Sequence, residues 1–547
     1  MTAVPGAPDG RAPDGGAPDG TVLTIDCGTQ SLRAFLFARD GTLLHRVKLD
    51  YEPYASPRPG WAEQDARLYW DTLARACRSL RAQGPEAFTR VQGVGVTTQR
   101  ASLVFVDGAG EPLRPAILWL DNRKASTVYR PGLFRAAAFR AAGVLETVRS
   151  LQREGKAAWV REHQPDLWSR TAFVLQLSGF LNHRLTGRFR DATAAQIGHT
   201  PFQYRQQRWC HPGELPALLF PIDRARLPEL VPAGGLLGRI TAAAQAATGL
   251  PEGLPVIACA SDKGCETLGT GCTGPGAASL SFGTTATVQT TSPSYFETLP
   301  FLPPYPAALP GHYNPEVEIF RGYWMISWFK RELAPREVQE AAALGVPVEA
   351  VLDRFLREVP AGSMGLVTLP HWGPSLDQPC TKGAMIGFGA VHTRGHLYRS
   401  VIEGLGFALR EGLERIEGAG GVRATRIGIS GGATQSGAIC QITADIFGRP
   451  LTAGETFETA GLGAAALTAA GVGLHPSILA AARAMVRPGR VYSPRPAQTA
   501  LYDQMYREVY RPLHPRLQPL YRRLRAILNY PERAADEAAL APVRLDP

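Results

Sequence analysis

The sequence predicts an α/β protein of two similar domains, because one strand–turn–strand unit occurs in it twice. Residues 21–41, TVLTIDCGTQSLRAFLFARDG, have apolar runs on both sides of a polar turn, and residues 277–291, AASLSFGTTATVQTT, repeat the pattern around Gly-Thr-Thr. Apolar residues on alternating positions are typical of strands. A chain of 547 residues is also too long for one core. We therefore expect a duplicated architecture in which the two turns face each other across a cleft.

Shifts in composition predict where the two domains begin and end. Residues 1–20 repeat Ala-Pro-Asp-Gly, which predicts a disordered tail because so few apolar residues cannot offset the ordering entropy. The stretch 251–255, PEGLP, predicts a linker. We expect an N-terminal domain at 21–254, a C-terminal domain at 255–530 and a C-terminal tail at 531–547.

The overall composition predicts a globular cytoplasmic protein. Hydrophobic residues make up 45% of the chain and charged residues 19%, as is typical of globular domains. The eight cysteines are dispersed without metal-ligand spacing, which indicates buried thiols in a reducing compartment. No apolar stretch is long enough to span a bilayer, and the N-terminus lacks the apolar core of a signal peptide, so we expect no membrane contact.

The net charge of +10 predicts a solvated basic surface and no nucleic-acid partner. The charge is carried mostly by scattered arginines, with no basic run that is interleaved with aromatic residues. A mild positive field would also suit an anionic nucleotide.

The first turn combines one carboxylate with several groups that could contact a phosphate. The carboxylate belongs to Asp26, and the groups after it belong to Gly28, Thr29, Gln30, Ser31 and Arg33. Glycine lets a phosphate approach the backbone, and consecutive N–H groups and hydroxyls can surround it. The carboxylate could face a hydrated Mg²⁺, which prefers few protein ligands. The alternative is a hairpin turn with a satisfied aspartate.

Polar side chains also gather where two further predicted strands of the first domain end. They are Gln99 and Arg100 after the strand that begins at residue 91, and Trp119 and Asp121 at the end of a strand within 117–124. Ligands commonly bind at strand ends in α/β proteins. The alternative is a structural ion pair such as Arg100 with Asp121.

Two motifs of the second half carry candidate chemistry. Asp262 and Lys263 directly follow a predicted strand at 256–260. Asp262 could serve the chemistry or cap the next helix. Gly431 and Gly432 stand between a strand and a helix that carries Gln435, and bare backbone at a helix start favours an anionic nucleotide.

Together these motifs resemble the FGGY family of carbohydrate kinases, in the wider group of actin-like, sugar-kinase and Hsp70-like ATPases. The most specific match is 382–403, KGAMIGFGAVHTRGHLYRSVIE, which fits the second signature of the family except at Phe388. The resemblance implies two actin-like, ribonuclease H-like domains with a central cleft for nucleotide and sugar. It implies ATP and Mg²⁺ as cofactors and a small sugar or polyol as substrate, and it is compatible with a homodimer.

The resemblance also implies a role for each candidate residue. Asp262 would be the general base that accepts the proton of the attacking hydroxyl, and Asp26 would face Mg²⁺. The sugar would be held by Gln99, Arg100, Trp119, Asp121, Asp262 and Lys263. ATP would be held by Gly28, Thr29, Gln30, Ser31, Arg33, Gly283, Thr284, Gly431, Gly432 and Gln435. Relatives often carry Gln or Asn at position 263, so Lys263 would alter substrate preference or pair with Asp262.

The substrate is predicted less sharply than the reaction. Gln99 and Arg100 match a glycerol-kinase motif, but Ala101 replaces the carboxylate that follows them in that motif. We therefore expect ATP-dependent phosphorylation of a ketopentose such as xylulose, or of a polyol. The alternatives are a glycerol kinase and a non-catalytic ATP-binding regulator of the actin/Hsp70-like group.

Overall fold

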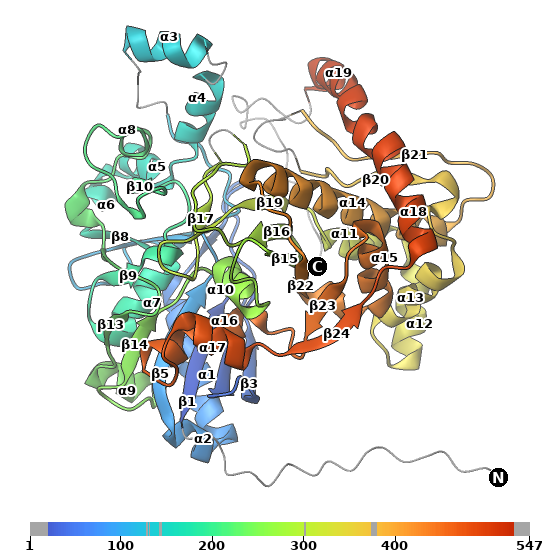
Figure 1. Cartoon of the computed structure of the whole chain (residues 1–547). Helices are drawn as coiled ribbons and strands as arrows, with labels where there is room; N and C mark the ends of the chain where they lie inside the picture. Colours follow the sequence, from blue (N-terminus) through green and yellow to red (C-terminus); the bar gives the residue numbers. More distant parts are fainter. Residues whose placement is uncertain are drawn as a thin grey trace, which may run out of the picture.

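The computed structural model contains two six-stranded mixed sheets, one in each half of the chain (Figure 1). The structure describes residues 20–126, 130, 132–141, 145–299, 302–373 and 380–529. Both predicted tails, apart from Gly20, lie outside the described residues.

The first sheet has the strand order β13-β14-β5-β1-β2-β3. Its strands are β1 (Thr21–Cys27), β2 (Ser31–Ala38), β3 (Leu43–Asp50), β5 (Val91–Thr98), β13 (Leu236–Arg239) and β14 (Pro255–Ala258). The hairpin β1–β2 extends antiparallel to β3, whereas β5 lies parallel to β1 on the other side and β14 lies parallel to β5.

The second sheet has the order β19-β16-β15-β22-β23-β24. Its strands are β15 (Ala277–Phe282), β16 (Ala286–Thr290), β19 (Glu316–Ile319), β22 (Arg426–Ser430), β23 (Leu451–Gly454) and β24 (Pro488–Tyr492). Here the hairpin β15–β16 extends antiparallel to β19, and β22 and β23 follow in parallel on the other side of β15.

The two sheets match strand for strand, which confirms the duplicated α/β architecture. Each ends in a strand antiparallel to its neighbour, β13 beside β14 in the first sheet and β24 beside β23 in the second. The chain order of these last two strands differs, because β13 precedes β14 whereas β24 follows β23.

The first sheet continues past the predicted domain boundary at 254/255. Residues 255–258 form β14, which pairs with β5, so this strand belongs to the first sheet and not to the second. Local sequence indicated a strand here, but the choice of sheet depends on a partner about 160 residues earlier in the chain, which periodicity does not encode.

Helices and smaller sheets surround the first sheet. The helices are α1 (Ala66–Gln83), α2 (Pro85–Thr89), α3 (Leu133–Ala141), α4 (Leu145–Arg153), α5 (Lys156–His163), α6 (Pro165–Arg170), α7 (Leu177–Thr186), α8 (Leu215–Leu219) and α9 (Ala242–Thr248). The additional strands are β4 (Glu63–Gln64), β6 (Leu103–Val106), β7 (Ala116–Ile117), β8 (Phe173–Gln176), β9 (Arg190–Ala192), β10 (Phe202–Gln203), β11 (Arg208–Trp209) and β12 (Glu229–Val231). Asp65 caps α1 through the N–H of Arg67, and Gly187 ends α7 in the left-handed conformation.

The second half adds longer helices. They are α10 (Asp262–Gly269), α11 (Trp324–Leu333), α12 (Pro335–Leu344), α13 (Val348–Glu358), α14 (Arg394–Gly420), α15 (Gly437–Phe447), α16 (Thr459–Gly471), α17 (Ile478–Met485), α18 (Pro496–Met505) and α19 (Arg511–Leu528). The short strand pairs are β17 (Tyr305–Pro306) with β18 (Tyr313–Asn314), and β20 (Val367–Leu369) with β21 (Ala384–Ile386). None of the described helices is long and apolar enough to cross a bilayer.

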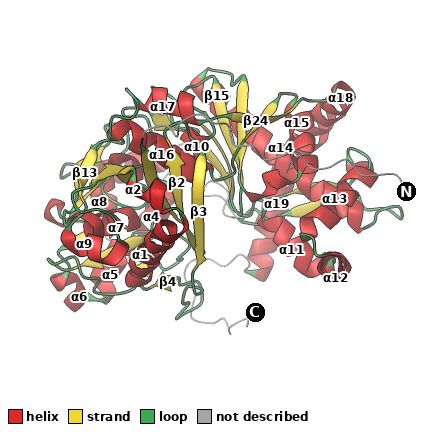
Figure 2. Ribbon diagram, turned by 90° about the horizontal axis from the view of Figure 1, so that it is seen from below, coloured by secondary structure: helices red, strands yellow, loops and turns green. Residues whose placement is uncertain are grey.

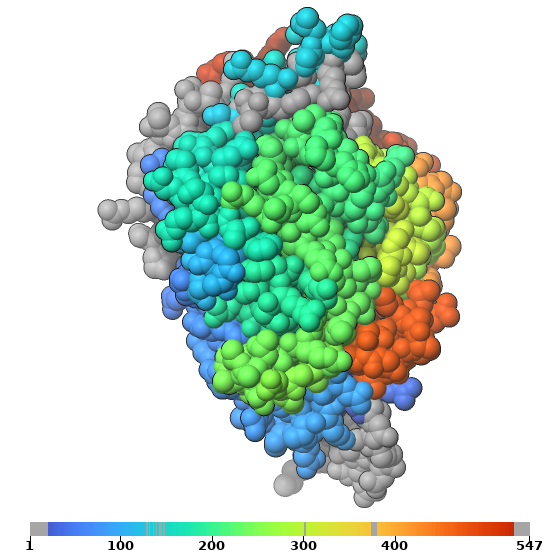
Figure 3. Space-filling model, turned by 90° about the vertical axis from the view of Figure 1, so that its left-hand side faces the viewer, coloured from blue at the N-terminus to red at the C-terminus, as the bar shows by residue number. Residues whose placement is uncertain are grey.

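Helix α16 joins the two halves, because it packs against α10 and against β1 and β5 of the first sheet. Figures 1 and 2 both draw α10 and α16 where the halves meet. The small residues of α16 permit its close approach to α10, because a Cβ on Gly463 of α16 would lie 1.9 Å from the backbone oxygen of Cys265 on α10. In Figure 3 an orange-red segment of the second half lies against the blue and green surface of the first.

Candidate active site

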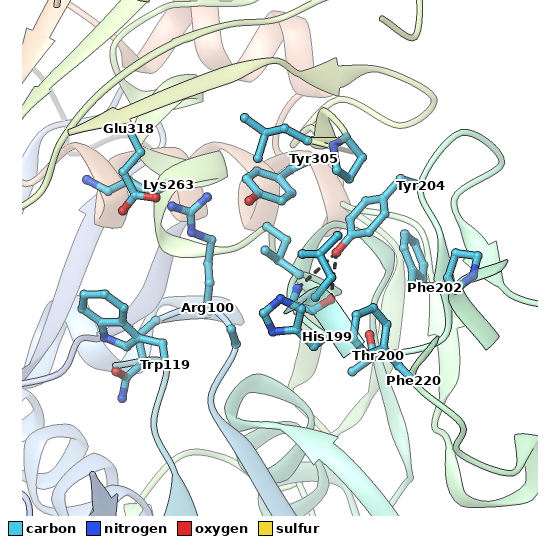
Figure 4. Close-up of a pocket in the computed structure, with 18 of the residues that line it drawn as sticks. Arg100, Trp119, His199, Thr200, Phe202, Tyr204, Phe220, Lys263, Tyr305 and Glu318 are labelled. Atoms are coloured by element: carbon cyan, nitrogen blue, oxygen red, sulfur yellow. Dashed lines mark hydrogen bonds between the residues drawn. The ribbon is translucent and has the colours of Figure 1, made fainter. Parts of the chain in front are cut away.

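One cavity of about 780 Å³ lies between the two halves and collects many of the predicted site residues (Figure 4). The predicted residues that line it are Thr29, Gln99, Arg100, Trp119, Asp262, Lys263, Gly283 and Thr284. Both Gly-Thr turns therefore reach the same cavity, as the cleft prediction requires.

The turn after β1 joins a predicted phosphate residue to two predicted sugar residues. The N–H of Gly28 donates to the oxygen of Ser31 (3.0 Å), which closes the turn between β1 and β2. The Thr29 hydroxyl donates to Oε1 of Gln99 (2.8 Å) and accepts from Nε1 of Trp119 (2.9 Å). These two hydrogen bonds hold Thr29, Gln99 and Trp119 together on one wall of the cavity, where a sugar and a phosphate could lie side by side.

Asp26 is a buried carboxylate at the end of β1, only 8% exposed. Burial raises its pKa to about 7, although the Arg33 guanidinium opposes this, and the charge of Asp262 adds to the rise. Its contact with Arg33 is long, 3.4 Å, and Arg33 is shared with Glu458 at 3.6 Å. Because Arg33 neutralises the negative charge of Asp26 only in part, the carboxylate is suited to bind a cation.

Mg²⁺ fits this position by the chemistry of its donors. Among the described residues no group of three or more His, Cys, Asp and Glu side chains is arranged to hold a metal. The Asp26 carboxylate next to a phosphate-binding turn is the kind of single protein ligand that a hydrated Mg²⁺ tolerates.

Asp262 is the first residue of α10, but it does not cap the helix. The cap is Ser261, whose hydroxyl accepts from the N–H of Gly264 (3.2 Å). One Asp262 oxygen accepts from the N–H of Lys263 (2.7 Å), and burial raises the pKa of the carboxyl against the opposing charges of Arg100 and Lys263. A carboxylate with a raised pKa that lines the cavity can accept a proton.

Lys263 pairs with Glu266, not with Asp262 as one alternative expected. Its ammonium donates to Glu266 (2.7 Å) and to the Ser281 hydroxyl (2.7 Å). Because the side chain is tied to α10 and β15, Asp262 is left free of a direct ion pair with it.

Arg100 crosses the cavity to the second half. Its guanidinium donates to both oxygens of Glu316 on β19 (3.1 Å each) and lies over the ring of Tyr305 at 5.1 Å. Burial alone would lower the pKa of Arg100, but the Glu316 carboxylate raises it overall. The two halves are therefore joined by a buried ion pair at the site.

Asp121 is not among the residues that line the cavity. Its side chain is fully buried, and its oxygens accept from the N–H of Ala62 (2.6 Å) and from the guanidinium of Arg123 (2.7 Å). The alternative pair of Asp121 with Arg100 is therefore wrong. The predicted strand at 117–124 is also shorter, since β7 ends at Ile117.

The other predicted residues of the first hairpin do not line the cavity. They flank Thr29 in the β1–β2 hairpin and are Asp26, Gly28, Gln30, Ser31 and Arg33.

The predicted adenosine segment starts directly after β22. Gly431 has a φ of +91°, and a Cβ there would lie 2.8 Å from the carbonyl carbon of Phe282, next to the second turn. A Cβ on Gly432 would meet nothing within 4 Å, and Gln435 is exposed. Open backbone beside Gly283 suits a nucleotide, although this segment does not line the cavity itself.

Sequence reasoning missed several residues that line the cavity or hold it together. They are His199, Tyr204, Tyr305, Glu316 and Glu318. Burial, followed by the charge of Glu316, raises the pKa of Glu318 well above its usual value. One available signal was the strand sequence EVEI at 316–319, in which two carboxylates share one face of β19.

Sequence models of one family match most of the chain. The N-terminal domain of the FGGY family of carbohydrate kinases matches residues 21–269, and its C-terminal domain matches residues 278–472. The chain belongs to the FGGY family of carbohydrate kinases. It is therefore a phosphotransferase with an alcohol group as acceptor, and ATP is the phosphate donor of this family.

Individual relatives differ in the substrate that their names state. The kinase is 29% identical to an uncharacterized sugar kinase, YgcE, of Escherichia coli, over 90% of this chain and 93% of that protein. It is 30% identical to a glycerol kinase of Dechloromonas aromatica, over 90% and 97% of the two chains. The crystal structure of a xylulose kinase from Rhodospirillum rubrum superposes with a TM-score of 0.77 at 29% identity, over 92% and 100% of the chains.

Proposed function

We propose that this kinase transfers the γ-phosphoryl group of ATP to a hydroxyl of a ketopentose such as xylulose, or of a polyol, with Asp262 as general base. The observation that carries the proposal is the position of the Asp262 carboxylate, which lines one cavity together with Thr29 of the first turn and Thr284 of the second. Phosphoryl transfer depends mostly on positioning and charge neutralisation, and such a cavity supplies both.

Asp262 is proposed to orient the attacking hydroxyl and to accept its proton. Its raised pKa and its lack of a direct ion pair with Lys263 support this role. The base needs no more strength than this, because the proton leaves late in a loose phosphoryl-transfer reaction.

The two hairpins on either side of Asp262 are proposed to contact the phosphates of ATP. Thr29 and Arg33 on the first hairpin and Thr284 on the second would contact phosphate oxygens, and Gly431 and Gly432 would lie along the adenosine. Mg²⁺ held at Asp26 would neutralise phosphate charge. The ion pair of Arg100 with Glu316 would keep the halves closed around the substrate and exclude water, which would otherwise compete as acceptor.

The sugar is proposed to lie against Gln99, Arg100 and Trp119. Ala101 also lines the cavity, in a left-handed conformation (φ 55°) that Lys156 supports by donating to its carbonyl (2.9 Å). A methyl group at this position leaves space where the glycerol-type motif has a carboxylate. The proposal therefore favours a substrate longer than glycerol.

A coupled ADP-release screen over pentuloses, hexuloses, glycerol and tetritols tests the proposal. The expected result is ATP-dependent turnover that is highest for a pentulose or polyol longer than glycerol. Glycerol ranked first would replace the substrate and keep the reaction, whereas ATP binding without turnover of any acceptor would favour a regulator.

A further inference from the structure

The cavity has two ends of different chemistry, and the proposed reaction uses only one of them. Asp262, Lys263 and Arg100 lie at the polar end. In Figure 4, Phe202 and Phe220 lie at the opposite side of the cavity from Lys263 and Glu318. Helix α8 contacts β10, so Leu215 and Leu219 of α8, which also line the cavity, lie near Phe202.

A continuous path of aromatic rings connects the two ends. The Arg100 guanidinium lies 5.1 Å from the centre of the Tyr305 ring, which lies 6.0 Å from the ring of Tyr204. Tyr204 in turn meets Phe202 edge-on at 5.2 Å. A ligand that is phosphorylated near Asp262 could therefore extend along Tyr305 and Tyr204 without leaving the cavity.

The cavity is larger than a five-carbon substrate needs. Cavities of roughly 300–1,000 Å³ hold drug-sized ligands, and this one measures about 780 Å³. A nucleoside triphosphate whose terminal phosphate lies at Gly283 and Thr284 would occupy only the polar side of the cavity. The remaining space is at the apolar end.

The walls of the far end are suited to an apolar group and not to further hydroxyls. Sugar hydroxyls that leave water need hydrogen-bond partners. The phenylalanine and leucine side chains at this end provide none, and the Tyr204 hydroxyl is already bonded to the backbone N–H and carbonyl of Gly198. Burial of apolar surface there is favourable.

The charges around this end favour a neutral group. His199 packs against Phe220 at 5.2 Å, and burial, helped by Lys156, lowers the pKa of His199 to about 3, so its ring is neutral at physiological pH. Glu297, which also lines the cavity, is exposed and accepts from the Tyr295 hydroxyl (2.6 Å). A carboxylate on the cavity wall disfavours an anionic substituent.

We propose that the physiological acceptor is a polyol or ketose that carries a neutral alkyl or aryl substituent far from the phosphorylated hydroxyl, and that this substituent occupies the end of the cavity lined by Phe202 and Phe220. The inference rests on the proposed function and names the substrate class within it.

The test compares three acceptors that differ only at one end: xylitol, its terminal mono-O-benzyl ether and its terminal mono-O-(2-hydroxyethyl) ether. The benzyl ether adds apolar surface, and the hydroxyethyl ether adds length without it. We expect kcat/KM for the benzyl ether to exceed that for xylitol by about tenfold or more, the effect of burying one apolar group, and the hydroxyethyl ether to gain less than about twofold. The same comparison with D-xylulose and its benzyl ether covers a ketose acceptor.

A pair of matched variants locates the effect. Phe220→Ser should reduce the ratio of kcat/KM for the benzyl ether over xylitol toward one. Phe457→Ser changes a half-exposed phenylalanine outside this cavity and should leave the ratio at its wild-type value. If Phe220→Ser does not fold, as judged by its melting temperature, the wild-type ratios still decide the question.

Three outcomes separate the inference from the proposed function on which it rests. Turnover of xylitol or D-xylulose with no gain for the benzyl ethers overturns the inference and leaves the kinase proposal intact. Equal gains for benzyl and hydroxyethyl ethers also overturn it, because length alone would explain them. An absence of ATP-dependent turnover for all acceptors overturns the proposed function and the inference with it.

Discussion

The turns of the two hairpins stand at the same place in their sheets, but they differ by one residue in register and in the side chains that they carry. Asp26 stands two residues before Gly28 and pairs across the hairpin with Arg33, and Ser281 stands two residues before Gly283 and pairs with Thr287. The first position therefore holds a buried carboxylate, whereas the second holds a hydroxyl that accepts from Lys263. The two copies of one scaffold therefore carry a form of the turn with a carboxylate and a form without one.

Their exposure differs as well. Thr29 is held by Gln99 and Trp119, whereas Thr284 is exposed at the cavity wall. The first turn is thus tied to Gln99 and Trp119, which are proposed to hold the sugar, whereas the Thr284 side chain of the second turn is open to the cavity. This second difference arises from neighbours outside the repeated unit, whereas the difference between Asp26 and Ser281 lies within it.

The largest expected effect distinguishes Asp26 from Ser281. Asp26→Ala should reduce Mg²⁺-dependent kcat on the order of 10³-fold or more, the scale seen when a key charge is removed from a phosphoryl-transfer site. Ser281→Ala removes the equivalent side chain of the other copy and should reduce kcat only a few-fold. Steady-state kinetics across Mg²⁺ concentrations, with circular dichroism to verify folding, measure both. A kcat of Asp26→Ala within a few-fold of wild type at saturating Mg²⁺ would contradict the expected difference between Asp26 and Ser281.

The next effect concerns the chemistry of α10, where cap and proposed base are neighbours. Asp262→Asn keeps the shape of the side chain but cannot accept the proton, so kcat should fall by about 10²- to 10⁴-fold. Affinity for ATP, measured by calorimetry, should remain nearly unchanged, because the adenosine segment lies elsewhere.

Ser261→Ala is the matched control for that variant. It removes the helix cap, which is worth about 1 kcal/mol, and should lower the melting temperature while kcat changes little. If Asp262→Asn retains normal kcat and normal stability, Asp262 has no role in the mechanism.

A smaller effect tests the substrate side. Glycerol should have a kcat/KM at least about tenfold below that of the best ketose or polyol, which corresponds to about 1.4 kcal/mol of barrier. The reason is that Ala101 provides no carboxylate for its hydroxyls. A panel in which glycerol ranks first would contradict this, and the kinase assignment would remain.

The parts of this site that sequence predicted are those whose residues are close together in the chain. The two turns, the carboxylate before Gly28 and Asp262 after β14 are local patterns, and α/β strand periodicity made them visible. The contact of Arg100 with Glu316 joins residues 216 positions apart and depends on how the halves are placed. The same reason explains why the predicted domain boundary falls before β14 and why Asp121 was expected in the cavity: Ala62, 59 positions earlier, is brought to Asp121 only by the fold.

The smallest expected effect uses pH to compare the two turns without catalysis. The pKa of Asp26 is raised to about 7 in the folded protein from an ordinary value of 3.8. The folded state therefore holds a proton that the unfolded chain has already released, and stability from this group decreases as pH rises through that window. Asp26→Asn cannot titrate, so its melting temperature relative to wild type should rise by a few degrees between pH 5 and pH 8 without Mg²⁺. Added Mg²⁺ at pH 8 should stabilise the wild type and reduce the difference, because the cation binds only the carboxylate. Ser281→Ala, which retains Asp26, should follow the wild type in parallel across the same range. A constant offset for Asp26→Asn would show that folding does not raise the pKa of Asp26.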